Sequence, residues 1–207
     1  GETFKVGIVN YVDHASLNQI VESVESRLNE IGKEKGVTFD YAGYYANAQA
    51  DQSNLNQIGA DLVGDDVDVI VAVATPTAAT MLAAVEDTDI PVVYSAVTDP
   101  AAAGFDGEEN ITGTSDALNT EAIMKLITAV NPDIDTIGLL YDLSQDASTQ
   151  AIADAKAFCD ANGIKYIEKN GTTTAEVQMA AEALIASGVK AVFTPTDNTV
   201  MTAELSI

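Results

Sequence analysis

One short motif occurs twice and places hydroxyl groups where a small anion could bind. The chain reads AVATPTAAT at residues 72–80 and AVFTPTDNT at residues 191–199. In each copy an apolar strand is predicted to run into a helix, with Thr75 or Thr194 as the cap and the following proline at the first helical position. Because the first N–H groups of a helix lack intrahelical partners, each junction predicts a site for an anionic group.

The predicted strand ends favour a carboxylate over a phosphate ester. They hold hydroxyl, carboxylate and aromatic side chains but no lysine or arginine, and the sole arginine, Arg27, lies within the first predicted helix. Phosphate sites normally use a cation, whereas threonine hydroxyls, backbone N–H groups and a helix dipole worth about 0.3–2 kcal/mol can hold a carboxylate. The strand-end segments are residues 10–14, 75–77, 95–99, 115–116, 141–142 and 196–199.

Acidic residues in these segments and aromatic residues in or near them extend the predicted ligand to an α-amino acid. Asp99, Asp116 and Asp197 offer counter-charges for an ammonium group. Aromatic rings that end strands near the same rim could form the wall around an apolar or aromatic ligand side chain, although such rings also belong to many protein cores. They are Tyr11, Tyr94, Tyr141 and Phe193.

Other site chemistries lack the residues they require. No GxGxxG follows the first strand and no P-loop pattern occurs, so nucleotide sites are not expected. His14 is the only histidine, which excludes a multi-histidine metal centre and leaves a Ser-His-Asp triad without a nucleophile elbow; its ring could still hydrogen-bond a ligand. Cys159 is the only cysteine, which excludes paired catalytic thiols and an internal disulfide. We predict no catalytic residue, no metal and no cofactor.

Composition indicates a globular, strongly acidic chain. It has 207 residues, 47% of them apolar, and nine basic against 32 acidic residues give a net charge of −23. This charge repels nucleic acid and anionic membranes, so neither is an expected partner. No apolar stretch reaches the roughly 18 residues of a membrane span. Cys159 falls in line with Ile152, Ala155 and Phe158 on one helix face, which predicts a core position.

The elements that must position these residues alternate between strand and helix. The first predicted helix opens at Ser16, with Gln19 completing a capping box. Near-continuous apolar strands joined by helices predict a parallel sheet covered on both faces. Strands are predicted at residues 5–11, 36–43, 67–74, 90–97 and 111–115, and helices at 53–63, after Thr75, and at 119–130.

The second half repeats this order, since TIGLLYD at residues 136–142 parallels KVGIVNY at residues 5–11. Aligning Gly7 with Gly138 and Thr75 with Thr194 needs only modest gaps, which favours a duplicated unit over two unrelated α/β units. We therefore predict an α/β fold of two doubly wound parallel-sheet lobes, residues 1–116 and 117–207. A ligand cleft between the lobes would let both junctions contact one ligand.

Five motifs in order resemble the ABC-transporter substrate-binding family linked to uptake of tryptophan, tyrosine or phenylalanine. They are ADQSNLNQI at 50–58, ATPTA at 74–78, IPVVYSAVTDP at 90–100, NITGTSD at 110–116 and PTDNTV at 195–200. The resemblance implies a type I periplasmic-binding fold that closes by hinge motion, and delivery of the ligand to a membrane permease. It also implies export, usually as a lipoprotein. The chain differs from the family pattern at Ala15, where a proline would follow the histidine.

Matched by motif, the family's ligand contacts fall on both predicted lobes. The resemblance implies Thr75, Thr77, Ser95, Thr98, Asp99, Ser115 and Asp116 on the first lobe, and Thr196, Asp197 and Asn198 on the second. The chain ends soon after Val200, so we expect an incomplete second lobe whose exposed sheet edges could support a homodimer.

Three functions stay open at this point. The first is the extracytoplasmic binding component of an ABC importer, which takes a hydrophobic and by preference aromatic amino acid without catalysing a reaction. The second is the ligand-sensing domain of a regulator or receptor with the same fold. The third, an enzyme acting on an amino acid or sugar, is disfavoured because no nucleophile and base pair stands out in the sequence.

Overall fold

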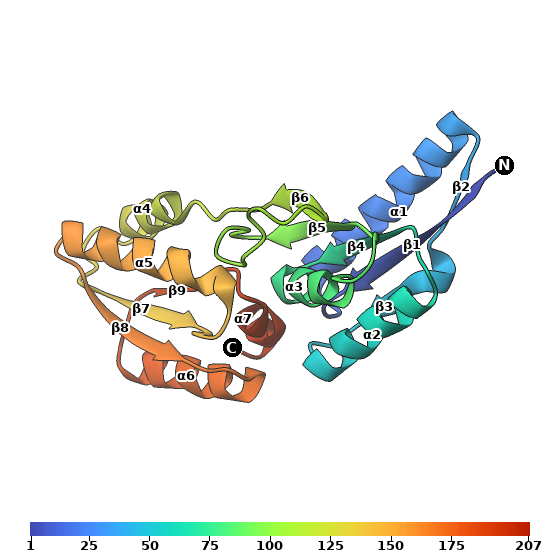
Figure 1. The fold of residues 1–207 in the computed structure, drawn as a ribbon. Helices are drawn as coiled ribbons and strands as arrows, with labels where there is room; N and C mark the ends of the chain where they lie inside the picture. Colours follow the sequence, from blue (N-terminus) through green and yellow to red (C-terminus); the bar gives the residue numbers. More distant parts are fainter. The chain divides into compact units, whose positions relative to one another are not determined.

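The computed structural model describes residues 1–207 and divides the chain into two compact units. Unit 1 comprises Gly1–Asp116 and unit 2 comprises Ala117–Ile207. Each unit has its own parallel sheet with helices on both faces, so the predicted α/β fold class is confirmed (Figure 1). No helix combines the length and the apolar character needed to cross a membrane.

Unit 1 is built on the strand order β2-β1-β4-β5-β6, with β3 pairing beside β1, and every pair is parallel. The carboxyl ends of all its strands therefore lie at one edge of the sheet. The strands are β1 Thr3–Asn10, β2 Thr38–Asp40, β3 Tyr45–Asn47, β4 Val69–Val73, β5 Val92–Val97 and β6 Ile111–Ser115. The helices are α1 Ala15–Lys35, α2 Gln52–Gly64 and α3 Thr75–Ala84, with a 3-10 turn at Ala42–Tyr44.

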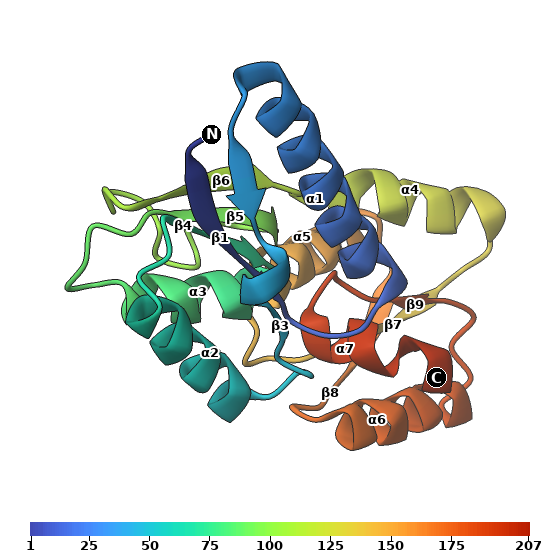
Figure 2. The same cartoon turned by 90° about the vertical axis from the view of Figure 1, so that its right-hand side faces the viewer.

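The two faces of this sheet are covered by different helices, with α1 on one face and α2 and α3 on the other (Figure 2). Strand β1 shows why, because successive side chains point to opposite faces. Asn10 bonds to Asn18 of α1, whereas Gly7 lies beneath Leu62 of α2. A Cβ atom at Gly7 would lie 2.9 Å from a Leu62 methyl carbon, so this close approach of helix and strand requires glycine.

Unit 2 has a three-stranded parallel sheet in the order β8-β7-β9. Gly138 of β7 lies beneath Leu184 of α6 with a Cβ clearance of 3.2 Å, which repeats the arrangement of Gly7 and Leu62 in unit 1. The elements are α4 Thr120–Val130, β7 Thr136–Tyr141, α5 Asp146–Ala161, β8 Lys165–Asn170, α6 Thr174–Ala186, β9 Val192–Phe193 and α7 Asn198–Ala203, followed by a 3-10 turn at Glu204–Ser206.

The core of unit 2 has two halves, one on each face of β7. Alternate residues of this strand explain the division. Ile137 and Leu139 pack with α4 and α5, and Leu140 packs with α6 and α7. Cys159 is buried in the first half beside Ile152 and Ala155, which confirms its predicted core position. Burial also raises the pKa of the Cys159 thiol, so this side chain stays protonated and unreactive.

The start of α1 differs from the prediction. His14, not Ser16, caps the helix: its backbone is extended, and its ring Nδ1 accepts a hydrogen bond from the Ser16 N–H at 3.2 Å. Ser16 is the second residue of the helix, so the capping box with Gln19 is wrong. An imidazole with an unprotonated Nδ1 can accept a hydrogen bond from a backbone N–H, as a serine hydroxyl does. The helix cap is therefore His14, two residues before the predicted cap Ser16.

Candidate functional site

The carboxyl edge of the unit 1 sheet holds three buried oxygens that lack a hydrogen-bond partner. They are Asn10 Oδ1 at the end of β1, and Thr75 Oγ1 and Thr77 Oγ1 at the start of α3. These residues are 0%, 4% and 0% exposed. Leaving a buried polar group unpaired costs about 1–3 kcal/mol, so folded proteins rarely keep such groups without a functional reason. Strands β1 and β4 are neighbours, which brings the three oxygens to one stretch of the edge.

The junction between β4 and α3 is strained. Ala74 caps the helix with φ of 85° and donates its N–H to the Ser95 carbonyl oxygen at 2.9 Å. Thr75 is therefore the first residue of α3 rather than its cap, and no side chain caps this helix end. A non-glycine residue at such a φ costs about 1–3 kcal/mol, and strain of this kind gathers at functional sites. The threonine hydroxyls and the first N–H groups of α3 are thus available to an anionic group.

Strand β5 carries a second irregularity at the same edge. Ala96 has φ of 56°, and the pairing of β5 with β6 shifts register between Tyr94 and Val97. Bulges of this kind often redirect side chains near binding sites. The predicted residue Ser95 lies within this stretch of β5.

The segments after β5 and β6 bring Thr98 and Asp116 together. Desolvation raises the pKa of Asp116, while hydrogen bonds from its own backbone and from the Thr98 side chain oppose this rise. The Asp116 N–H donates to the Val97 carbonyl oxygen, which ties the end of β6 at Ser115 to the end of β5. Asp99 has another task, because its carboxylate accepts from the Ala102 N–H and closes a turn.

Tyr11 and His14 follow β1 at the same edge. Tyr11 is buried in the unit 1 core, and His14 caps α1 as described above. A chain of side-chain hydrogen bonds runs beside them: Asn10 Nδ2 donates to Asn18 Oδ1 at 3.0 Å, and Asn18 Nδ2 donates to Asp13 Oδ1 at 2.6 Å.

The second copy of the repeated motif is built differently from the first. Strand β9 ends at Phe193 and α7 begins only at Asn198, so neither Thr194 nor Pro195 starts a helix. Thr194 is exposed, whereas its counterpart Thr75 is buried. Asp197 caps α7 by accepting from the Val200 N–H at 2.7 Å, and aspartate ranks above threonine as a helix cap. The prediction that Thr194 caps a helix in the way predicted for Thr75 is wrong.

Asp197 forms the centre of a buried network in unit 2. Its Oδ2 accepts from the Asp142 N–H and from Ser148 Oγ, both at 2.9 Å. Asp142 in turn accepts from Ser144 and from Thr199 Oγ1. Burial raises the pKa of Asp197, and the hydrogen bonds it accepts oppose this rise. These contacts hold the start of α7 against the end of β7.

The other predicted residues of unit 2 lie around this network. Asn198 is buried as the first residue of α7 and Thr196 is half-buried in the loop before it. Tyr141 is buried at the end of β7, and its hydroxyl donates to Glu168 at 2.8 Å, so it anchors β8. The buried oxygens at the carboxyl edge of unit 1 have no hydrogen-bond partner. In the Asp197 network, by contrast, the carboxylate oxygens accept hydrogen bonds from groups of unit 2.

Comparison with known proteins assigns the family. The family model described as ABC transporter substrate binding protein matches residues 5–207. The chain belongs to this family. It is 29% identical over 203 residues to the tyrosine-binding protein of Clostridioides difficile strain R20291, which covers 95% of this chain. The chain spans only 57% of the length of that curated relative.

Solved structures give the same assignment for this substrate-binding protein. The ABC domain of Streptococcus pneumoniae in complex with L-Trp superimposes with a TM-score of 0.87 at 29% identity, covering 99% of this chain and 69% of the other. A conserved domain protein of Vibrio cholerae O1 biovar El Tor has a TM-score of 0.82 at 31% identity, covering 98% and 68%. The predicted type I periplasmic-binding fold is confirmed by these neighbours.

Two residues of the candidate site were not singled out from the sequence of the substrate-binding protein. Asn10 lay within a strand-end segment but was assigned no role, and Asn18 falls on α1, outside every strand-end segment. Both residues matter because the Asn10 side chain at the end of β1 donates a hydrogen bond to the Asn18 side chain on α1, eight positions later. The usable signal was a lone amide at the end of the apolar run of β1, which is a costly residue to bury.

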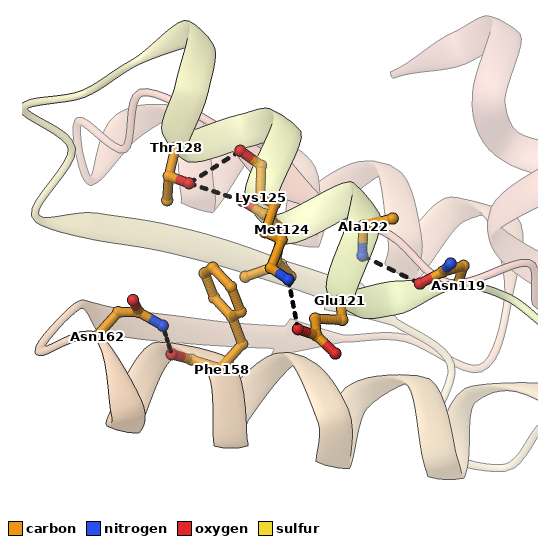
Figure 3. Close-up of polar contacts among 8 residues, drawn as sticks. All are labelled: Asn119, Glu121, Ala122, Met124, Lys125, Thr128, Phe158 and Asn162. Carbon is orange, nitrogen blue, oxygen red and sulfur yellow. Dashed lines mark hydrogen bonds and ion pairs between the residues drawn. The ribbon is translucent and has the colours of Figure 1, made fainter.

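A separate groove of about 710 Å³ lies between α4 and α5 in unit 2 of the substrate-binding protein. Figure 3 shows the ring of Phe158 rising from α5 toward α4, near the ion pair of Glu121 and Lys125 at 2.6 Å. Polar groups of the groove have partners within unit 2: Asp154 accepts from Gln150, and Asn162 donates to the Phe158 carbonyl oxygen. The groove therefore lacks the unsatisfied cluster that marks the unit 1 edge.

Thr120, at the first position of α4, is the exception in this groove and gives a stability prediction. Its hydroxyl is buried without a hydrogen-bond partner. We expect Thr120→Val to raise the free energy of unfolding of unit 2 by roughly 1 kcal/mol, because an unpaired buried hydroxyl is replaced by a methyl group of similar size. Denaturant unfolding measures this change. The matched variant Thr149→Val, at an exposed position of α5, should change stability by less than about 0.5 kcal/mol; a loss of stability in Thr120→Val would contradict the account.

Proposed function

We propose that this chain is the ligand-binding part of an extracytoplasmic, non-enzymatic component of an ABC importer, and that its ligand is a hydrophobic and by preference aromatic amino acid. The observation that carries the proposal is the unpaired oxygen cluster of unit 1 at the strained start of α3. The family assignment and the names of two relatives, one binding tyrosine and one solved with L-Trp, support this ligand class.

The ligand carboxylate would bind at the start of α3. Thr75 Oγ1, Thr77 Oγ1 and the first N–H groups of the helix supply donors, and the helix dipole adds attraction without any lysine or arginine. Ser95, Thr98 and Asp116 border this position from β5 and β6, and Ser115 precedes Asp116. Tyr11 and His14 border it from β1. Closure of a cleft that brings Tyr141, Thr196, Asp197 and Asn198 of unit 2 to the ligand stays a prediction of the sequence.

Asp99 and Asp197 are less suited to direct ligand contact than the sequence implied. Asp99 closes a turn, and Asp197 is 0% exposed with both carboxylate oxygens accepting hydrogen bonds inside unit 2. We infer that Asp197 positions the second lobe's residues rather than meeting an ammonium group. Asp116 is exposed and remains the acidic candidate of the first lobe.

The partners follow from the importer role. A membrane permease would receive the ligand, and attachment to the membrane through a lipid would keep the protein beside it. The homodimer expected from exposed sheet edges stays a prediction. A sensing domain of a regulator would share the pocket, but the family description names a transporter component, which favours the importer.

A thermal-shift screen of the full chain against the twenty amino acids tests the proposal. Affinity in the micromolar range, about −8 kcal/mol, suits nutrient capture. A ligand at 100 times its Kd stabilises the folded state by about 2.7 kcal/mol, so we expect the melting temperature to rise by roughly 5–10 °C with tyrosine, tryptophan or phenylalanine. Glutamate and lysine serve as negative controls. If none of the twenty shifts the melting temperature at millimolar concentration, the proposed function is wrong.

A further inference from the structure

The hydrogen-bond chain beside β1 fixes the orientation of the Asn10 side-chain amide. Asp13 is exposed, and a carboxylate only accepts hydrogen bonds. The group that meets Asp13 at 2.6 Å must therefore be the NH₂ of Asn18. Asn18 then presents its oxygen to Asn10, at 3.0 Å, and this position requires the NH₂ of Asn10.

The side-chain oxygen of Asn10 is the one polar atom of this hydrogen-bond network at Asn10 that has no partner, and it is an acceptor. Turning the Asn10 amide over would set its oxygen against the Asn18 oxygen, which removes a hydrogen bond and adds repulsion between two acceptors. Asn10 Oδ1 is therefore locked in place as a buried acceptor, and it has no partner. A group that completes this site must be a hydrogen-bond donor.

The place of Asn10 in the sheet indicates which donor this is. The register pairs Val9 of β1 with Ala72 of β4, so Asn10 lies level with Val73, immediately before the strained start of α3. Neighbouring strands are about 4.8 Å apart. An α-amino acid carries its ammonium group on the carbon next to its carboxylate, so a carboxylate held at α3 places the ammonium within reach of β1.

We propose that Asn10 Oδ1 accepts a hydrogen bond from the α-ammonium group of the ligand, and that Asn18 and Asp13 are positioning residues that hold Asn10 in the accepting orientation. This inference rests on the proposed function. The negative charge of Asp13 polarises the two amides between it and the ligand, which strengthens Asn10 Oδ1 as an acceptor.

A comparison of ligand pairs tests this assignment. Isothermal titration calorimetry would measure L-tyrosine against 3-(4-hydroxyphenyl)propionate, and L-tryptophan against indole-3-propionate, in the full chain. Each second compound lacks only the ammonium group. We expect the natural chain to prefer the amino acid at least tenfold, and Asn10→Leu to reduce this preference at least fivefold, because the variant keeps a side chain of similar shape but removes the acceptor.

The matched control is Asn47→Leu. Asn47 ends β3 beside β1, and its side-chain Oδ1 already accepts from the Gln49 N–H, so the ligand preference should stay unchanged. Asn18→Ala removes the positioning contact and should reduce the preference while Asn10 itself is kept. The same preference in the Asn10→Leu variant as in the natural chain would overturn the assignment.

A measurement on the natural chain keeps the test decisive if the variants fold poorly. The side-chain ¹⁵N–H₂ resonances of Asn10 should shift on addition of L-tyrosine and shift much less on addition of 3-(4-hydroxyphenyl)propionate. Failure of the two proposals can be told apart. If the natural chain binds both members of a pair equally, the Asn10 assignment alone is wrong; if it binds no amino acid, the proposed function is wrong and this assignment with it.

Discussion

Replacement of Asp197 with alanine is expected to lower the free energy of unfolding of unit 2 by about 3 kcal/mol. The carboxylate is fully buried and accepts three hydrogen bonds, from the Val200 N–H, the Asp142 N–H and Ser148 Oγ. Removing it leaves three buried donors without an acceptor and takes the cap from α7. The loss is partly offset because a buried carboxylate, whose pKa is raised by burial, no longer has to be desolvated.

Denaturant unfolding and amide hydrogen exchange would measure this effect, with exchange showing whether α7 and the end of β7 lose protection together. Asp160→Ala is a matched control, because Asp160 is an exposed aspartate on α5; its change should stay within about 0.5 kcal/mol. Asp197→Asn keeps one acceptor oxygen, so its loss of stability should be smaller than that of Asp197→Ala and larger than that of Asp160→Ala. Equal stabilities for Asp197→Ala and Asp160→Ala would contradict the network's role.

Replacement of Thr77 with valine is expected to weaken amino-acid binding at least tenfold and, in the absence of ligand, to stabilise unit 1. The Thr77 hydroxyl is buried without a partner, so its removal relieves an unpaired group worth roughly 1 kcal/mol while valine fills the same volume. A ligand carboxylate would lose one hydrogen-bond donor, and a hydrogen bond to a charged group contributes about 1.5–3 kcal/mol. Thr75→Val should behave in the same way.

Calorimetry with L-tyrosine and L-tryptophan, together with denaturant unfolding of the unliganded chain, separates the two effects. Thr80→Val on the same helix is the control. Its hydroxyl donates to the Pro76 carbonyl oxygen, so the ligand affinity should not change. Natural affinity in both Thr75→Val and Thr77→Val would remove the first turn of α3 from the ligand site.

Much of the fold could be predicted because its signals are local and periodic. Strand β6 lies at the predicted residues Ile111–Ser115, and α2 extends the predicted helix 53–63 by one residue at each end. The sequence alignment made Gly7 and Gly138 equivalent positions of the two units. The structure explains the match, because each glycine lies beneath a leucine of a covering helix. Strand β3 could not be predicted, since three residues after a 3-10 turn carry too short a pattern.

The candidate site was predictable only in part. Thr75 was singled out because a threonine before a proline at a strand end is a helix-start signal, and Thr77 through its match to the family motif; the structure leaves both hydroxyls unpaired. The assumption that equal motifs have equal geometry failed at Thr194, where Asp197 competes as the cap. Asn10 could not be ranked from the sequence because its orientation depends on Asn18 and Asp13, which only the fold brings to it.

Under the proposed function, the unpaired oxygens of unit 1 would link nutrient supply to the lifetime of the protein. A ligand that bonds to Asn10, Thr75 and Thr77 would satisfy these buried oxygens. The ligand-bound folded state would then be more stable against unfolding than the ligand-free one. In a medium short of that nutrient, more molecules open transiently and become accessible to proteases. The concentration of receptor at the cell envelope would then follow the concentration of its own cargo without a dedicated regulator.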